Sequence, residues 1–136
     1  MLTVLAYCFA NKNEERVDEN KYFPTITVLL TVYNEENKVI DRLKNILNCF
    51  YPSDKLKVVV VSDGSTDNTN SLVQNFDSDI VKLIVPTQGS GKTAAQNFAI
   101  KFIESELIVF TDADTIFDPS FLEEVVQPFK NKEVGG

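Results

Sequence analysis

Four short apolar runs alternate with segments of helical periodicity, and this alternation constrains the fold more than any other feature of the chain. The runs are Thr25–Tyr33, Leu56–Val61, Ile80–Val85 and Leu107–Phe110. The second run ends in four consecutive β-branched valines, which is typical of a strand that is covered on both faces. Strands and helices that alternate in this way connect by right-handed crossovers into a mostly parallel sheet. We therefore expect an α/β domain with helices on both faces of the sheet.

The helices between these strands are predicted from apolar spacing and from residues that typically begin or end a helix. We expect the first helix after Asn34 as N-cap, with Glu35 and Glu36 in its first turn, and its apolar residues are Val39, Ile40, Leu43, Ile46, Leu47 and Phe50. The second is expected over Thr66–Phe76. The third is marked by Ala95, Phe98, Ala99, Phe102 and Ile103, and the fourth by Asp118 as cap, Pro119 as first helical residue, and Phe121, Leu122, Val125, Val126 and Phe129.

Charge and composition exclude several classes of function. The 136 residues carry 13 basic and 20 acidic side chains, a net charge of -7, so the chain lacks the positive field that nucleic acid or an anionic membrane surface requires. A phosphorylated ligand stays compatible with this charge, because a metal ion held by carboxylates can neutralise it. The chain has no histidine. Ser-His and Cys-His catalysis and histidine-ligated metals are therefore excluded.

The ends of the chain and its cysteines bear on its organisation. Cys8 and Cys49 lie among apolar neighbours without metal-ligand spacing, and we interpret both as reduced residues of a cytosolic protein. The apolar run Met1–Ala10 is too short to span a membrane. We expect residues 1–23 to form an extension or linker and residues 24–136 to form one domain. The sequence stops directly after a predicted helix, so we expect the domain to be incomplete.

Polar segments follow all four predicted strands, at the edge where parallel sheets bind ligands. They are Tyr33-Asn34-Glu35, Ser62-Asp63-Gly64-Ser65, Thr87-Gln88-Gly89-Ser90-Gly91-Lys92 and Thr111-Asp112-Ala113-Asp114. Their carboxylates, glycines and lysine together indicate a site for a phosphorylated ligand.

Two of these segments offer carboxylates for different tasks. Asp112 and Asp114 flank a small residue, so both can approach one Mg²⁺ or Mn²⁺ ion, although a D-x-D pair is also common in ordinary surface turns. Asp63 follows the most buried strand, where it can accept hydrogen bonds from a base or a ribose, or simply belong to a turn. Asp67 is interpreted as structural. Tyr33 can stack on a base or pad the core.

In this order and spacing, TVYNEE, VVVVSDGSTDNT, GSGKTAAQN and IVFTDAD resemble the nucleotide-binding half of family 2 glycosyltransferases, from Pro24 to Gly136. The resemblance implies the Rossmann-like half of a GT-A fold. It is strongest to processive or membrane-associated members that use UDP-sugars and build polysaccharides.

The resemblance also implies roles for individual residues. Thr31, Tyr33 and Glu35 would cradle the nucleotide, and Asp63 would contact the uracil or the ribose. Lys92 would lie near the diphosphate. Asp112 and Asp114 would hold the ribose and a Mg²⁺ or Mn²⁺ ion, with Asp114 as the more direct metal ligand.

The implied activity is transfer of a hexose from a UDP-sugar to the hydroxyl of a carbohydrate or lipid-linked acceptor, with inversion. Family members carry the carboxylate that deprotonates the acceptor well downstream of D-x-D, and we assign no catalytic base within these 136 residues. We therefore expect this chain alone to be inactive. The parent is expected to be cytoplasmic, at the cytoplasmic face of the membrane if it is membrane-associated.

Two other interpretations compete with this one. Gly89-Ser90-Gly91-Lys92-Thr93 lies between a strand and a helix like the loop of a P-loop NTPase, but that loop needs a glycine where Pro86 stands, and proline has no N–H for a phosphate. The other alternative is a nucleotide-binding module without catalysis, which has the binding residues and needs no base.

Overall fold

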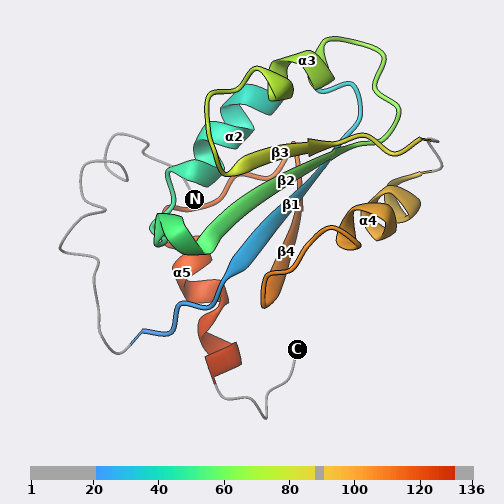
Figure 1. Ribbon diagram of the computed structural model, residues 1–136. Coiled ribbons are helices and arrows are strands. Elements are labelled where there is room, and N and C mark those ends of the chain that lie inside the picture. Colours follow the sequence, from blue (N-terminus) through green and yellow to red (C-terminus); the bar gives the residue numbers. More distant parts are fainter. Residues whose placement is uncertain (1–20, 88–90, 131–136) are drawn as a thin grey trace.

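The computed structural model describes residues 21–87 and 91–130, and it confirms the predicted α/β architecture (Figure 1). One parallel sheet has the strand order β3-β2-β1-β4. Its strands are β1 (Ile26–Val32), β2 (Leu56–Ser62), β3 (Val81–Ile84) and β4 (Leu107–Asp112). All seven residues of β1 are buried, as expected of an apolar strand between two neighbours and two helical layers.

Helices cover both faces of the sheet, as predicted. On one face lie α2 (Val39–Leu47), α3 (Thr69–Gln74) and α5 (Phe121–Val125), and α4 (Lys92–Ile100) lies on the other. The first layer packs against alternate residues of β1 and β2 and forms the larger core. The second core is smaller because α4 contributes mainly Ala95 and Ala99, which pack on Leu29, Val59 and Val61. Short 3-10 segments span Ser53–Lys55 and Gln127–Lys130.

The first helix begins later than predicted. Asn34 is not its N-cap, and Glu35 and Glu36 do not lie in its first turn, because α2 begins at Val39 with Lys38 as N-cap. The carbonyl of Glu35 instead accepts hydrogen bonds from the N–H groups of Lys38 and Val39, which form a tight turn before the helix. This turn leaves Asn34 and both glutamates in a loop above the sheet.

The other helices are shorter than predicted. The second does not begin at Thr66, because side chains from the β1–α2 loop take up the N–H groups of residues 66–68, as described below. The third ends at Ile100, and Phe102 is 59% exposed in the following turn. In the fourth, neither Asp118 as cap nor Pro119 as first helical residue is correct. Ser120 is the N-cap, and the Asp118 carboxylate accepts hydrogen bonds from the Ser120 N–H and hydroxyl.

The segment just before β1 packs against the domain. The Tyr22 N–H donates to Gln127 Oε1 over 3.1 Å, and Lys21 lies 3.4 Å from a carboxylate oxygen of Glu123. Cys49 is buried in the larger core, whereas Cys8 lies outside the described residues. None of the helices within residues 21–87 and 91–130 has the length and apolarity to cross a bilayer.

Candidate functional site

The strand register brings the predicted site residues of three strands to one edge of the sheet. Thr31 of β1 pairs with Asp112 of β4, and Val32 pairs with Ser62 of β2. The Asp63 N–H continues this ladder by donating to the Val32 carbonyl over 2.9 Å. Because neighbouring strands lie about 4.8 Å apart, the DGSTD and D-x-D segments flank the end of β1 from its two sides. Residues 88–90 of the fourth polar segment lie outside the described residues.

Asp63 carries an acceptor that its own surroundings leave unsatisfied. Its Oδ1 atom is buried and has no hydrogen-bond partner in the described structure. Leaving a buried polar atom without a partner costs about 1–3 kcal/mol. Tyr33, at the end of the neighbouring strand, exposes 58% of its surface. An orphaned acceptor and an exposed aromatic ring at adjacent strand ends are suited to hold a planar ligand with a hydrogen-bond donor.

Asn34 joins the two loops that carry Tyr33 and Asp63. Its φ angle is 51°, a left-handed conformation that asparagine tolerates better than most residues. Its Oδ1 accepts hydrogen bonds from the N–H groups of Thr66, at 2.7 Å, and Asp67, at 3.3 Å, and its own N–H donates to Ser65 Oγ. Thus Asn34, predicted as a helix cap, instead fixes the DGSTD loop against the end of β1.

Replacing Asn34 with alanine is expected to lower the free energy of unfolding by about 2 kcal/mol, because the substitution removes these side-chain hydrogen bonds and strains the left-handed backbone. Asn34→Gly also removes the side-chain hydrogen bonds but tolerates the left-handed backbone without strain. Its free energy of unfolding should therefore fall by less than that of Asn34→Ala. Urea denaturation of both variants checks this order. Equal losses would show that the backbone conformation contributes nothing.

Glu36, Asp67 and Thr69 complete the contacts between these loops. The Asp67 carboxylate accepts from the Thr69 N–H at 2.9 Å and from the Glu36 N–H at 3.3 Å, while Glu36 Oε1 accepts from the Asn68 N–H. Burial alone would raise the pKa of Asp67, but the hydrogen bonds from Thr69 and Glu36 outweigh it and lower that pKa. The predicted structural role of Asp67 is confirmed. Glu35 is also bound to the start of α3, because its N–H donates to Thr69 Oγ1 over 2.8 Å.

The two aspartates of the D-x-D segment have different surroundings. Asp112 ends β4, and its Oδ1 accepts hydrogen bonds from the N–H groups of Asp114 and Thr115 and from Thr115 Oγ1. The Thr115 hydroxyl is the main reason why the pKa of Asp112 is lowered. Asp114 points outward, and its Oδ1 lies 2.6 Å from the Lys38 ammonium, which raises the pKa of Lys38. The turn thus presents two carboxylates, one hydrogen-bonded within the turn and one paired with Lys38.

These donors fit a hard divalent cation that shares its coordination with a ligand. No group of three or more acidic, cysteine or histidine side chains that could hold a metal occurs within the described residues. A pair of carboxylates is too few for an all-protein cage. It matches Mg²⁺ or Mn²⁺ sites, in which phosphate oxygens and waters supply the remaining positions.

Arg42 of α2 binds the backbone and a side chain of the D-x-D segment, a role that was not predicted from the sequence. Its side chain is 1% exposed, and its Nε donates to the Asp112 carbonyl over 2.9 Å. Its two terminal nitrogens donate to Thr111 Oγ1 and to Asn45 Oδ1, both over 2.6 Å, and the guanidinium lies 4.2 Å from the centre of the Phe117 ring. Burial lowers the pKa of Arg42 to about 10, so the group stays charged at neutral pH.

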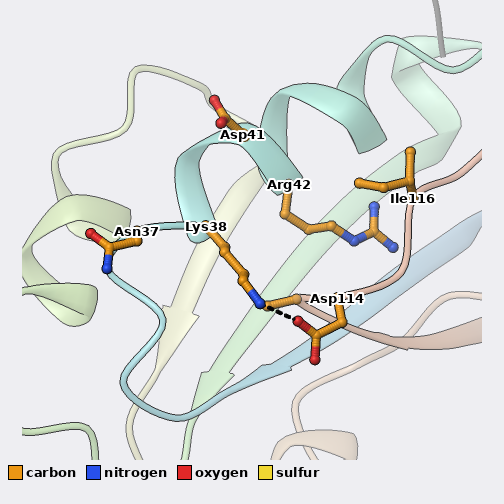
Figure 2. A pocket seen from close by; sticks show the side chains of 7 residues that line it. Asn37, Lys38, Asp41, Arg42, Asp114 and Ile116 are labelled. Carbon is orange, nitrogen blue, oxygen red and sulfur yellow. Dashed lines mark hydrogen bonds and ion pairs between the residues drawn. The ribbon is translucent and has the colours of Figure 1, made fainter. Parts of the chain in front are cut away.

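Asn45, about one turn after Arg42 on α2, binds the backbone of Phe117, three residues after Asp114. Its Nδ2 donates to the Phe117 carbonyl over 3.0 Å, and its Oδ1 accepts from the Phe117 N–H over 2.9 Å. Figure 2 shows Lys38 and Arg42 extending from α2 toward the D-x-D turn, around a pocket of about 270 Å³. Helix α2 therefore fixes the position of the turn.

Lys92 approaches Asp112 from the α4 side. It is the first residue of α4, after Gly91, whose φ of 104° turns the chain into the helix. Lys92, Gln96, Thr111 and Asp112 line one cavity of about 260 Å³, and the charge of Lys92 contributes to the lowered pKa of Asp112. Gln96 Nε2 also donates to Thr31 Oγ1 over 3.2 Å. The structure thus brings Thr31, Lys92 and Asp112 together, whereas Tyr33 and Asp63 lie at the other side of the β1 end.

Comparison with known proteins places this arrangement in a family. The model of the family described as "Glycosyl transferase family 2" matches residues 27–136. The chain belongs to this family. The resemblance to family 2 glycosyltransferases is therefore confirmed.

Individual relatives agree with this assignment. The chain is 31% identical to the probable glycosyltransferase YdaM of Bacillus subtilis, covering 96% of this chain and 32% of that protein. It is 32% identical to a poly-beta-1,6-N-acetyl-D-glucosamine synthase of Staphylococcus aureus, covering 93% and 30%. The chain thus spans about a third of the length of these relatives.

Solved structures confirm the fold. The mannosyltransferase PcManGT from Pyrobaculum calidifontis, in complex with GDP-Man and Mn²⁺, matches with a TM-score of 0.75 and 33% identity over 93% of this chain and 40% of that one. TarS of S. aureus, in complex with UDP, matches with a TM-score of 0.70 and 26% identity over 77% and 32%. The predicted Rossmann-like half of a GT-A fold is therefore confirmed.

Proposed function

We propose that this chain binds the donor of a glycosyl transfer, a UDP-sugar, at the carboxyl edge of its sheet. The observation that carries the proposal is the buried, unpartnered Oδ1 of Asp63 beside the exposed Tyr33. Uracil offers an imide N–H to such an acceptor and a flat face to such a ring. Family membership supports a nucleotide-sugar ligand, and TarS, a neighbour in structure, has been solved with UDP-GlcNAc.

The remaining site residues suit the rest of the donor. Thr31 and Glu35 lie near the end of β1, where the ribose would follow the base, and Lys92 lies on the D-x-D side, where its charge would meet the diphosphate. Asp112 and Asp114 would hold Mg²⁺ or Mn²⁺, and Asp112 would also contact the ribose. When bound, the cation neutralises charge that develops on the leaving diphosphate. The Mn²⁺ in the PcManGT complex supports a cation in this family.

For the whole protein, we propose that a hexose passes with inversion to the hydroxyl of a carbohydrate or lipid-linked acceptor. In-line attack of that kind needs a general base within hydrogen-bond reach of the hydroxyl. We assign this role to a carboxylate outside the described residues, because Asp63, Asp112 and Asp114 are committed to the donor. Transfer by the 136-residue chain alone is therefore expected to be absent. We further propose that the parent protein acts in the cytoplasm, at the cytoplasmic face of the membrane if it is membrane-associated.

The nucleotide pair UDP and CDP tests the base assignment, because the two differ only in the pyrimidine ring. At the ring position where uracil has its N3–H, cytosine has an acceptor, which would leave Asp63 Oδ1 unsatisfied. With Mn²⁺ and UDP at about 100 times its Kd, the melting temperature should rise by roughly 10 °C. CDP, ADP and GDP should raise it less.

The matched variant for this test is Asp63→Ala, which removes the acceptor. It should abolish the preference for UDP over CDP while leaving the response to Mn²⁺ in place. If UDP and CDP shift the melting temperature of the unmodified chain equally, Asp63 does not read uracil. If no nucleotide shifts it, the chain is not the donor-binding part.

A further inference from the structure

The ammonium group of Lys38 stands at the carboxylate that we assign to the cation. Lys38 Nζ lies 2.6 Å from Asp114 Oδ1, and Figure 2 shows the two side chains pointing toward one another between the start of α2 and the D-x-D turn; both line the pocket there. Both side chains are largely exposed, at 57% for Lys38 and 68% for Asp114. A carboxylate oxygen that accepts a short bond from an ammonium group cannot offer the same lone pair to a metal ion.

Lys38, the N-cap residue of α2, differs in this respect from Arg42, the cation within α2 that contacts the D-x-D turn. Arg42 lies four residues further along the same helix face, is 1% exposed, and donates to backbone and neutral side-chain acceptors rather than to a carboxylate oxygen. Its position does not depend on what Asp114 binds. Lys38 is held by an exposed ion pair, which water and dissolved ions weaken readily.

We propose that Lys38 is an exchangeable counter-ion of the donor site. It neutralises Asp114 when the site is empty, and it turns to the diphosphate when the divalent cation takes the carboxylate. A cation that arrives alone competes with the Lys38 ammonium for the negative charge of Asp114 and is repelled by it. A cation that arrives with a nucleoside diphosphate brings new anionic oxygens to which the released ammonium can donate. Lys38 therefore disfavours the bare cation and favours the cation–nucleotide pair.

This inference rests on the proposed donor site. Two titrations of the full chain test the counter-ion role of Lys38 and the donor site separately. Mn²⁺ alone is titrated by electron paramagnetic resonance of the free ion, and UDP is titrated calorimetrically at saturating Mn²⁺. Lys38→Met should tighten binding of Mn²⁺ alone by about two- to fivefold, the range expected when an exposed ion pair no longer competes. The same variant should weaken UDP binding by about three- to tenfold through loss of a charge-assisted hydrogen bond.

Two control variants separate the effect of the Lys38–Asp114 ion pair from the effect of a positive charge elsewhere on the helix. Lys38→Arg keeps a cation beside Asp114 and should stay within about twofold of the unmodified chain in both titrations. Lys44→Met removes an exposed charge from the last turn of the same helix and should change neither affinity by more than about twofold.

The outcomes are distinct. Unchanged or weaker binding of Mn²⁺ alone by Lys38→Met overturns the counter-ion role. Tighter binding of Mn²⁺ together with unchanged UDP binding overturns the transfer of Lys38 to the diphosphate. A chain that binds Mn²⁺ but no UDP overturns the donor site itself.

Discussion

Replacing Asp114 with asparagine is expected to weaken Mn²⁺-dependent UDP binding by about 10- to 100-fold, the largest functional effect of any single substitution proposed for this chain. The amide keeps the shape of the side chain but loses the charge that a divalent cation requires. Because Asp114 is exposed, the free energy of unfolding should change by less than about 0.5 kcal/mol. Calorimetric titration with UDP, in Mn²⁺ and then in EDTA, measures the effect.

Asp41→Asn is the matched control for this substitution. Asp41 is an exposed carboxylate that lines the same pocket but lies on α2 rather than on the D-x-D turn. The control should bind UDP like the unmodified chain. If Asp114→Asn weakens UDP binding as strongly in EDTA as in Mn²⁺, its role does not involve a metal, and the cation must be held elsewhere.

Arg42→Leu is expected to lower the free energy of unfolding by about 2–4 kcal/mol, the largest effect on stability. The substitution removes the donors for the Asp112 carbonyl, Thr111 Oγ1 and Asn45 Oδ1, and the loss of these three hydrogen bonds in a largely buried setting accounts for most of this amount. Urea denaturation measures it. Lys44→Leu, on the exposed side of α2, should stay within about 0.5 kcal/mol.

Arg42→Lys separates charge from geometry in the same experiment. Lysine retains the positive charge but cannot donate to three acceptors at once. Its stability should fall between those of the unmodified chain and Arg42→Leu. At a temperature where all three proteins are folded, Mn²⁺-dependent UDP affinity should follow the same order, because the turn is held less firmly. A variant that loses stability but keeps full affinity would restrict Arg42 to a structural role.

The sheet and the helical layers could be predicted because each strand is rich in apolar residues and each helix repeats its apolar residues at helical spacing. The ends of the helices could not, because long-range hydrogen bonds decide them. Asn34 carries a strong capping signal, yet its side chain binds N–H groups of the loop before α3, 32 and 33 residues away along the chain. Local sequence does not show which N–H groups an asparagine will meet in the folded chain.

Within the site, the acidic residues were visible in the sequence because they follow directly after apolar strands. The basic residues of α2 were not. Arg42 lies three residues after Val39 and one before Leu43, on the apolar face of the helix, where an arginine is out of place. That irregularity is the signal that could have identified it. Whether Asp63, Lys92, Asp112 and Asp114 bind donor and cation stays a prediction, which the substitutions above test.

The strand order also determines when each part of the site forms during folding. The loops that hold Tyr33 and Asp63 meet through residues such as Asn34 and Ser65, 31 positions apart, whereas β4 joins β1 through contacts such as Thr25 to Glu106, 81 positions apart. Closing the longer loop costs more chain entropy and comes later on a chain made from its N-terminus. We therefore expect the loops of Tyr33 and Asp63 to come together before β4 docks on β1, so that the proposed cation site would be the last part of the proposed donor site to form.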